Sequence, residues 1–193
     1  MARQWPGSAA RDSNVTVVNG EQALVAACVA GDRDAFGRLV ERHQRTVYRL
    51  CYRFAGNHED ASDLAQEVFI RAYRGVGRFK GDSSVATWLY RIAVNVCLNH
   101  RAAERPRADA IDPERHVDGS GADPAEAIHR RQRAERVRAA IARLPRKQRA
   151  TVILRVYHEL PHEEIARVMG SSVGTVKANF FHALANLRKL VGR

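Results

Sequence analysis

The sequence predicts an all-α protein of two small helical domains joined by a flexible linker, and three observations support this fold class. Apolar residues recur at helical spacing over most of the chain, and no segment alternates as a half-buried strand would. Residues 101–125 hold three prolines, a Gly-Ser-Gly run and almost no large apolar side chain, so they can bury little surface. The net charge also differs between the two parts of the chain. Residues 1–126 contain 17 Lys/Arg and 17 Asp/Glu, whereas residues 127–193 contain 15 Lys/Arg and 4 Asp/Glu.

The first domain is predicted at residues 20–102, after a polar tail at residues 1–19 that we expect to be disordered. Its first helix covers about residues 21–30. Gly31-Asp32 breaks that helix and caps the second one, because aspartate accepts from free backbone N–H groups at a helix start. The second helix carries one apolar stripe and extends to about Gly56.

Asn57 caps a third helix, whose apolar face combines alanine, leucine, valine and phenylalanine side chains. The loop at residues 75–82 is too rich in glycine to continue this helix. A fourth helix is predicted at about residues 84–102, with Trp88 on its apolar stripe. Four such helices can form one compact bundle.

The linker is predicted at residues 103–125 and the second domain at residues 126–193. Asp123-Pro124 is a favourable cap and first position for a helix that reaches about Leu144. The remaining helices are expected at about residues 145–158, 162–169 and 173–190.

The last two of these helices have the spacing of a helix-turn-helix. Ala166 is small where the second helix crosses the first, Gly170 suits a left-handed turn, and Val176 locks the second helix in place. A plain helical hairpin allows the same spacing, but the basic surplus of this half favours DNA. The candidates for the groove-facing side are Ser172, Thr175, Lys177, Ala178, Asn179 and His182.

The string His158-Glu-Leu-Pro-His162 matches the HExxH pattern of zinc hydrolases. That chemistry needs both histidines one turn apart on an unbroken helix, and Pro161 disfavours such a helix. We therefore expect a helix junction here, with no metal and no cofactor.

An acidic stripe runs along one face of the third helix, because Glu59, Asp63 and Glu67 recur every four residues. From periodicity alone, a solvated surface is the ordinary interpretation. The surrounding residues suggest a second interpretation of this stripe. Asp63-Leu-Ala-Gln-Glu-Val-Phe69, with Arg71-Ala-Tyr73 after it, resembles region 2 of the extracytoplasmic-function sigma factors, a group of the sigma-70 family.

The resemblance extends to both halves of the chain, over about residues 21–100 and 127–191. Residues 78–84 and 87–95 are similar to the rest of region 2, and Leu144-Pro145 with Val173-Gly-Thr-Val-Lys177 is similar to region 4. The resemblance implies a cytoplasmic, non-enzymatic subunit that directs core RNA polymerase to promoters. An anti-sigma factor is the further partner that it implies, and no homo-oligomer is required.

The resemblance also implies roles for individual residues. Docking on the clamp helices of the largest polymerase subunit would use Asp63, Leu64, Gln66, Glu67, Val68 and Phe69. The melted −10 element would be held by Phe79, Lys80, Gly81, Asp82, Ser83, Thr87, Trp88, Arg91 and Asn95. The −35 element would be bound by the helix-turn-helix, comprising Ala166, Gly170, Ser172, Val173, Thr175, Val176, Lys177, Asn179 and His182.

Two of these assignments leave alternatives. Trp88 lies on an apolar stripe, so core packing competes with base contact as its role. Many family members carry serine and arginine after the Val-Gly-Thr-Val-Lys segment, where this chain has Ala178 and Asn179.

The runner-up function is a dimeric helix-turn-helix regulator that acts without being a polymerase subunit.

Other function classes are disfavoured by what the sequence lacks. No apolar run approaches the roughly 18 residues of a membrane-spanning helix, and the N-terminus does not resemble a signal peptide. Cys28, Cys51 and Cys97 stand far apart among apolar neighbours, so we expect buried free thiols.

Overall fold

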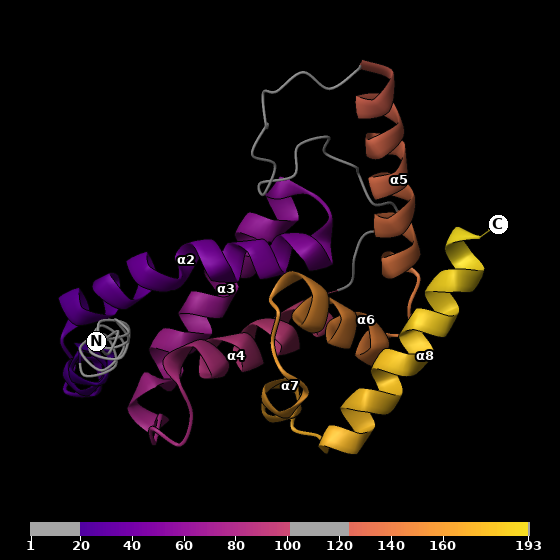
Figure 1. The fold of residues 1–193 in the computed structure, drawn as a ribbon. Helices are drawn as coiled ribbons and strands as arrows, with labels where there is room; N and C mark the ends of the chain where they lie inside the picture. The colour runs from indigo at the N-terminus through magenta and orange to yellow at the C-terminus, as the bar shows by residue number, and fades with distance from the viewer. Residues whose placement is uncertain (1–19, 101–123, 193) are drawn as a thin grey trace, which may run out of the picture.

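The computed structural model describes residues 20–100 and 124–192, in which every regular element is a helix (Figure 1). The predicted all-α fold class is confirmed. The predicted tail and most of the predicted linker lie outside the described residues. In chain order the elements are a first helix at 20–29, α2 (Arg33–Ala55), α3 (His58–Gly75), a 3-10 turn (Val76–Arg78), α4 (Val85–Asn99), α5 (Pro124–Ala142), α6 (Arg146–Val152), a π-helical turn (Ile153–Tyr157), α7 (His162–Met169) and α8 (Val173–Val191).

Short polar side chains start the helices of the N-terminal half, as the sequence predicts. The Asp32 carboxylate accepts from the Ala35 N–H at 3.0 Å at the start of α2. The Asn57 amide oxygen accepts from the Asp60 N–H at 2.8 Å at the start of α3. Gly56 ends α2 with a φ of 83°, a left-handed conformation that glycine adopts without strain.

The N-terminal half is a bundle in which α2 packs along α3 and α4. Its core consists of aliphatic side chains from all three helices, among them the fully buried Leu39, Leu50, Val68 and Leu89. Apolar faces of this kind remove enough surface from water to hold the helices together. The bundle fixes which sides of α3 and α4 remain available to partners.

Two helices differ from their predicted lengths. α4 ends at Asn99, because His100 has an extended backbone with a ψ of 123°. The predicted helix 145–158 is divided into α6 and the π-helical turn. Thr151 to Leu154 are four consecutive buried residues, and the wider π turn places more of them on one side than a regular helix would.

The C-terminal half packs α6, α7 and α8 around Ile153, Leu154, Ile165 and Val176, all of which are fully buried. α5 lies against one end of α8 (Figure 1). The two halves also touch, since α7 packs against α4 and the apolar cores merge into one cluster. This contact between the halves was not predicted.

Candidate nucleic-acid interface and protein-docking groove

The helix-turn-helix is formed by α7 and α8. Gly170 ends α7 with a φ of 57°, and the Ser171 N–H donates to the Ala166 carbonyl at 3.0 Å. Ala166 and Val176 are buried between the helices, so both pack α8 against α7 and neither is available at the surface. Val173 is half-buried and packs against the same core.

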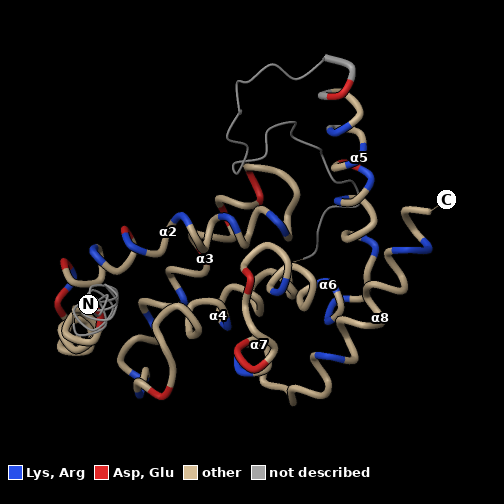
Figure 2. The backbone as a smooth tube through the Cα atoms, viewed as in Figure 1, with Lys and Arg blue, Asp and Glu red and all other residues tan. Residues whose placement is uncertain are grey.

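The outer side of α8 exposes Thr175, Lys177, Ala178 and His182, while Asn179 is half-buried. Phe181 is 70% exposed on this side, a residue that the sequence analysis did not select. Helical spacing places Phe180 on the apolar face and leaves Phe181 on the outer side, so spacing could have identified it. Figure 2 shows Lys and Arg distributed along α5, α6 and α8, which suits a polyanionic partner.

Ser172 has a structural role that was not predicted, because its side chain caps α8. Its hydroxyl oxygen accepts from the Thr175 N–H at 3.1 Å and lies 2.8 Å from the Thr175 hydroxyl. This cap fixes the backbone of the first turn of α8 and thereby the direction of the side chains at its N-terminal end. Ser172 stays exposed, but its oxygen is committed to the helix start.

Replacing the cap Ser172→Ala should lower the free energy of unfolding by about 1 kcal/mol, because one N–H of the first turn loses its acceptor. Urea unfolding followed by circular dichroism measures this. Ser172→Asn keeps a capping oxygen and should stay close to the parent chain. Equal loss in both variants would show that the hydroxyl acts in some way other than as a cap.

A groove lies between α2 and α3, on the side of α3 that carries the docking residues predicted by resemblance. It has a volume of about 620 Å³ and is lined by Val40, Gln44, Arg45, Tyr48, Ser62, Ala65, Gln66, Phe69 and Ile70. Of the predicted docking residues, Gln66 lines the groove and is exposed, and Phe69 lines it and is half-buried. Asp63 is exposed on the same helix. Leu64 and Val68 are buried in the core, so they hold α3 in place instead of facing a partner.

Two features of this groove were not predicted from the sequence. Ile70 is 45% exposed at its edge, next to the predicted segment. Val40 and Tyr48 come from α2, which the prediction did not include. Glu67 is paired within its own helix, because its carboxylate accepts from Arg71 at 2.7 Å. The groove lining combines apolar and aromatic side chains with polar ones, as protein interfaces commonly do.

The loop between the 3-10 turn and α4 forms a small pocket with aromatic and basic walls. The Phe79 ring lies 5.1 Å from the Trp88 ring, centroid to centroid, at an angle of 42°. The pocket has a volume of about 220 Å³ and is lined by Arg78, Phe79, Lys80, Asp82, Ser83, Trp88 and Arg91. Trp88 is half-buried, so it both packs on the core and faces this pocket. Stacking surfaces beside cations are what single-stranded DNA requires.

The remaining residues assigned to the −10 element have separate positions. Gly81 has a φ of 76° and allows the loop to turn, and Asn95 is exposed one turn after Arg91. Thr87 is only 1% exposed. Its hydroxyl donates to the Glu164 carboxylate of α7 at 2.7 Å, so α7 covers this part of the face.

The HExxH string lies at a helix junction. The π-helical turn ends at Tyr157, Glu159 has a φ of 53°, and α7 starts only at His162. The His162 ring packs against Phe180, with centroids 5.8 Å apart, while His158 packs against Tyr90. His158 therefore lies in the junction and His162 at the start of α7, and the two rings face different neighbours.

The three cysteines are buried free thiols, as predicted. Cys51 and Cys97 lie with their sulfur atoms 3.9 Å apart between α2 and α4. The hydrogen bond to Cys51, together with burial, raises the pKa of the Cys97 thiol, and burial raises that of Cys28. Raised pKa values keep thiols protonated and unreactive. Among residues 20–100 and 124–192, no helix combines the length and apolar character needed to cross a bilayer.

Comparison with known proteins matches both halves of the chain. Residues 39–107 match the model of sigma-70 region 2, and residues 134–187 match that of sigma-70 region 4. The chain is 38% identical over 172 residues to the RNA polymerase sigma-H factor of Pseudomonas aeruginosa, covering 84% of this chain and 89% of that protein. It is 37% identical to the ECF RNA polymerase sigma-E factor of Escherichia coli K12, covering 84% and 90%.

Solved structures agree with the fold. CnrH in complex with the cytosolic domain of CnrY aligns with a TM-score of 0.67 at 24% identity, over 89% of this chain and 97% of that one. The sigma factor RpoE of Bartonella quintana, in complex with the anti-sigma factor NepR, aligns with a TM-score of 0.57 at 21% identity, over 81% and 96%. At such identities, these two likenesses concern the fold.

Proposed function

Because the chain belongs to the extracytoplasmic-function group of the sigma-70 family, we propose that it is an alternative sigma factor whose two halves recognise −10 and −35 promoter elements on core RNA polymerase. The observation that carries the proposal is the match of region 2 and region 4, in this order, to the two helical halves. The dimeric regulator is not favoured, because the relatives match the chain through both halves.

We assign the groove between α2 and α3 to polymerase. The apolar side chains that line it suit an apolar partner surface, and the exposed Asp63 of the same helix suits a basic group on that partner. The residues proposed to make direct contact are Asp63, Gln66, Phe69 and Ile70. Leu64 and Val68 support them from the core.

We assign the loop and α4 to the unwound −10 strand, and α8 to −35 duplex. Phe79 and Trp88 provide stacking surfaces, and Lys80 and Arg91 provide cations. Each DNA site is small, and two weak sites act together only when something fixes their spacing. Core polymerase is the part that fixes it, with residues 103–123 as the connection.

Control by an anti-sigma factor is part of the proposal, supported by the structure of RpoE in complex with the anti-sigma factor NepR. The chain itself then needs no cofactor and catalyses no reaction. Its location is the cell interior, together with RNA polymerase.

The test compares the chain alone with the chain plus core polymerase. Fragments of genomic DNA are selected with the mixture, and the recovered promoters are used for footprinting and run-off transcription. We expect protection of −35 and −10 elements and transcripts only when both proteins are present. A tight footprint by the chain alone, over an inverted repeat and with a dimeric mass in light scattering, would contradict the proposal.

A further inference from the structure

The face of α4 that we assign to the −10 strand is covered by α7 in this structure. The Thr87 hydroxyl donates to the Glu164 carboxylate at 2.7 Å, and an Arg91 guanidinium nitrogen donates to the Arg167 carbonyl at 2.9 Å. Between them, the Tyr90 hydroxyl lies 3.1 Å from Nδ1 of His158. Three successive polar positions of α4 are thus each bound by the C-terminal half.

The groups that α7 offers are chemically like those of a nucleic-acid strand. Hydroxyl and guanidinium donors bind phosphate oxygens and base carbonyls in protein–DNA complexes. Here a carboxylate oxygen and a backbone carbonyl oxygen occupy the same donors. The covering element therefore presents acceptors and a negative charge to α4, beside the apolar contacts that join the two cores.

We propose that α7 is an internal substitute for the −10 strand, with the Glu164 carboxylate at Thr87 in the place of a DNA phosphate. The free chain then closes over its own −10 site, and DNA must displace α7 to enter. This inference rests on the proposed function, since it uses the same α4 face. It adds a regulatory contact that lies within the chain itself.

The surroundings of Glu164 fit a contact that is specific. Burial raises the pKa of Tyr90 to about 12, with the negative charge of Glu164 as a second cause. The Tyr90 phenol thus stays protonated and can donate to His158. Glu163, the neighbour of Glu164 in the first turn of α7, is exposed. Only one of these two adjacent carboxylates touches α4, and this provides a matched pair for experiment.

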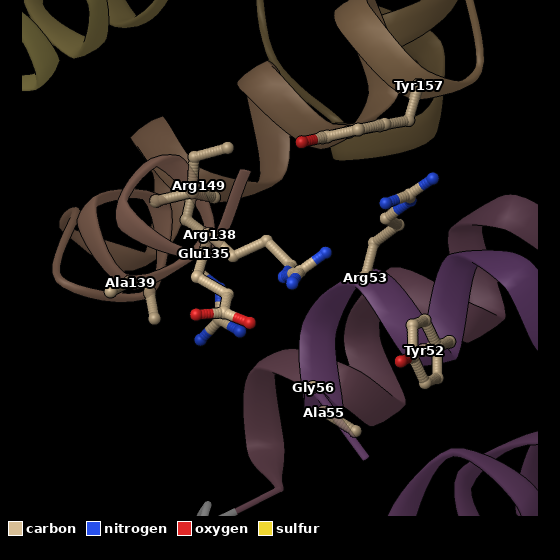
Figure 3. A pocket seen from close by; sticks show the side chains of 11 residues that line it. Tyr52, Arg53, Ala55, Gly56, Glu135, Arg138, Ala139, Arg149 and Tyr157 are labelled. Carbon is tan, nitrogen blue, oxygen red and sulfur yellow. The ribbon is translucent and has the colours of Figure 1, made fainter. Parts of the chain in front are cut away.

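A second set of contacts joins the halves at the end of α2. The Arg53 guanidinium carbon lies 4.0 Å from the centroid of the Tyr157 ring, and Arg149 donates to the Phe54 carbonyl. Figure 3 shows Arg53 facing Tyr157 across this joint, which Arg138 of α5 also lines. A cation beside the last carbonyls of a helix is favourable.

This joint is nevertheless incompletely packed. A cavity of about 260 Å³ remains between α2, α5 and α6. Among the described residues, Nε of Arg149 is buried without a hydrogen-bond partner, and burial lowers the pKa of this guanidinium. Voids and unpaired buried groups reduce the stability of a contact. The void and the unpaired group weaken the contact between the halves, which a reversible closure requires.

The polymerase groove faces elsewhere, so closure and docking are compatible. Gln66 and Ile70 stay exposed on α3 while α7 covers α4. Core polymerase can then bind the closed chain first, and DNA can enter after the halves separate. Closure would keep the free chain from holding single-stranded DNA that it meets without polymerase.

The test compares Glu164→Ala with Glu163→Ala, which remove the same charge from the same helical turn. Dyes attached at Glu41→Cys and Lys189→Cys report the distance between the halves by energy transfer in the full chain. The DNA probe is a short single strand enriched from a random pool by the parent chain with core polymerase. We expect Glu164→Ala to lengthen the distance and to bind this strand about tenfold more tightly without polymerase, while Glu163→Ala stays like the parent.

A third variant separates opening from DNA binding. Arg91→Ala should also lengthen the distance, because it loses the contact with the Arg167 carbonyl, but it should bind the strand more weakly than Glu164→Ala. Equal distances and equal DNA affinities for the two glutamate variants would overturn the inference. If the pool yields no strand, the proposed −10 function fails, and with it the idea that α7 replaces DNA. The distance measurement would then still report whether Glu164 holds the halves together.

Discussion

Ile70→Asp is expected to weaken binding of the chain to core RNA polymerase by about 30-fold or more, the loss typical of a residue at the centre of an interface. Ile70 is 45% exposed where it lines the groove between α2 and α3, so the free chain accommodates a polar side chain there. In the complex, a carboxylate would have to leave water for an apolar surface, which is unfavourable unless it is paired. Fluorescence anisotropy of the labelled chain, titrated with core polymerase, measures the affinity.

The chain offers a matched control in Ile128→Asp. Ile128 is 54% exposed on α5, away from the groove, and receives the same change of side chain. It should bind polymerase like the parent, and both variants should unfold at the parent's temperature. Similar losses in the two variants, or an unchanged affinity for Ile70→Asp, would remove the groove from the polymerase interface.

The helix starts and the helix-turn-helix could be predicted because their causes are local. Asp32 and Asn57 accept from N–H groups three residues away, and both signals are visible in a few letters of sequence. The same is true of α7, whose bounds match the prediction and which ends at the left-handed Gly170. Local propensity and tertiary packing agree in these segments.

The contacts that decide the site are non-local, and periodicity does not contain them. Thr87 and Glu164 are 77 positions apart, so nothing in the sequence indicated that the threonine would be covered. The groove on α3 depends on the angle at which α2 crosses it, which brings Val40 and Tyr48 beside Ile70. The sequence thus indicated which helices matter, whereas packing decided which side chains on them are free to bind.

The π-helical turn shows the same limit within one segment. Val152, Ile153 and Leu154 are apolar neighbours, and a regular helix would direct them to different sides. Ile153 and Leu154 are buried in the widened turn and Val152 directly before it, at the expense of helical regularity. Propensity favoured one continuous helix to His158, and burial of the apolar run overrode it.

Lys177→Glu is expected to lower the affinity of the holoenzyme for −35 duplex by about 30-fold at low salt, because a phosphate contact is replaced by repulsion. Lys177 is exposed in the first half of α8. Losing one phosphate contact should also reduce the slope of log affinity against log salt by about one unit. Binding of labelled duplex by the full chain with core polymerase, at several salt concentrations, measures both effects.

The distribution of the loss among DNA sequences decides what Lys177 contacts. Phosphates are the same in every sequence, so the affinity should fall by a similar factor for all variants of the −35 element. Lys189→Glu, with the same charge change in the last turn of the same helix, should have a much smaller effect, because that turn lies farthest from the N-terminal end that enters the groove. A loss confined to some −35 sequences would place Lys177 on a base edge instead. Equal losses for Lys177 and Lys189 would show that the overall positive charge of α8, and not its docking geometry, holds the duplex.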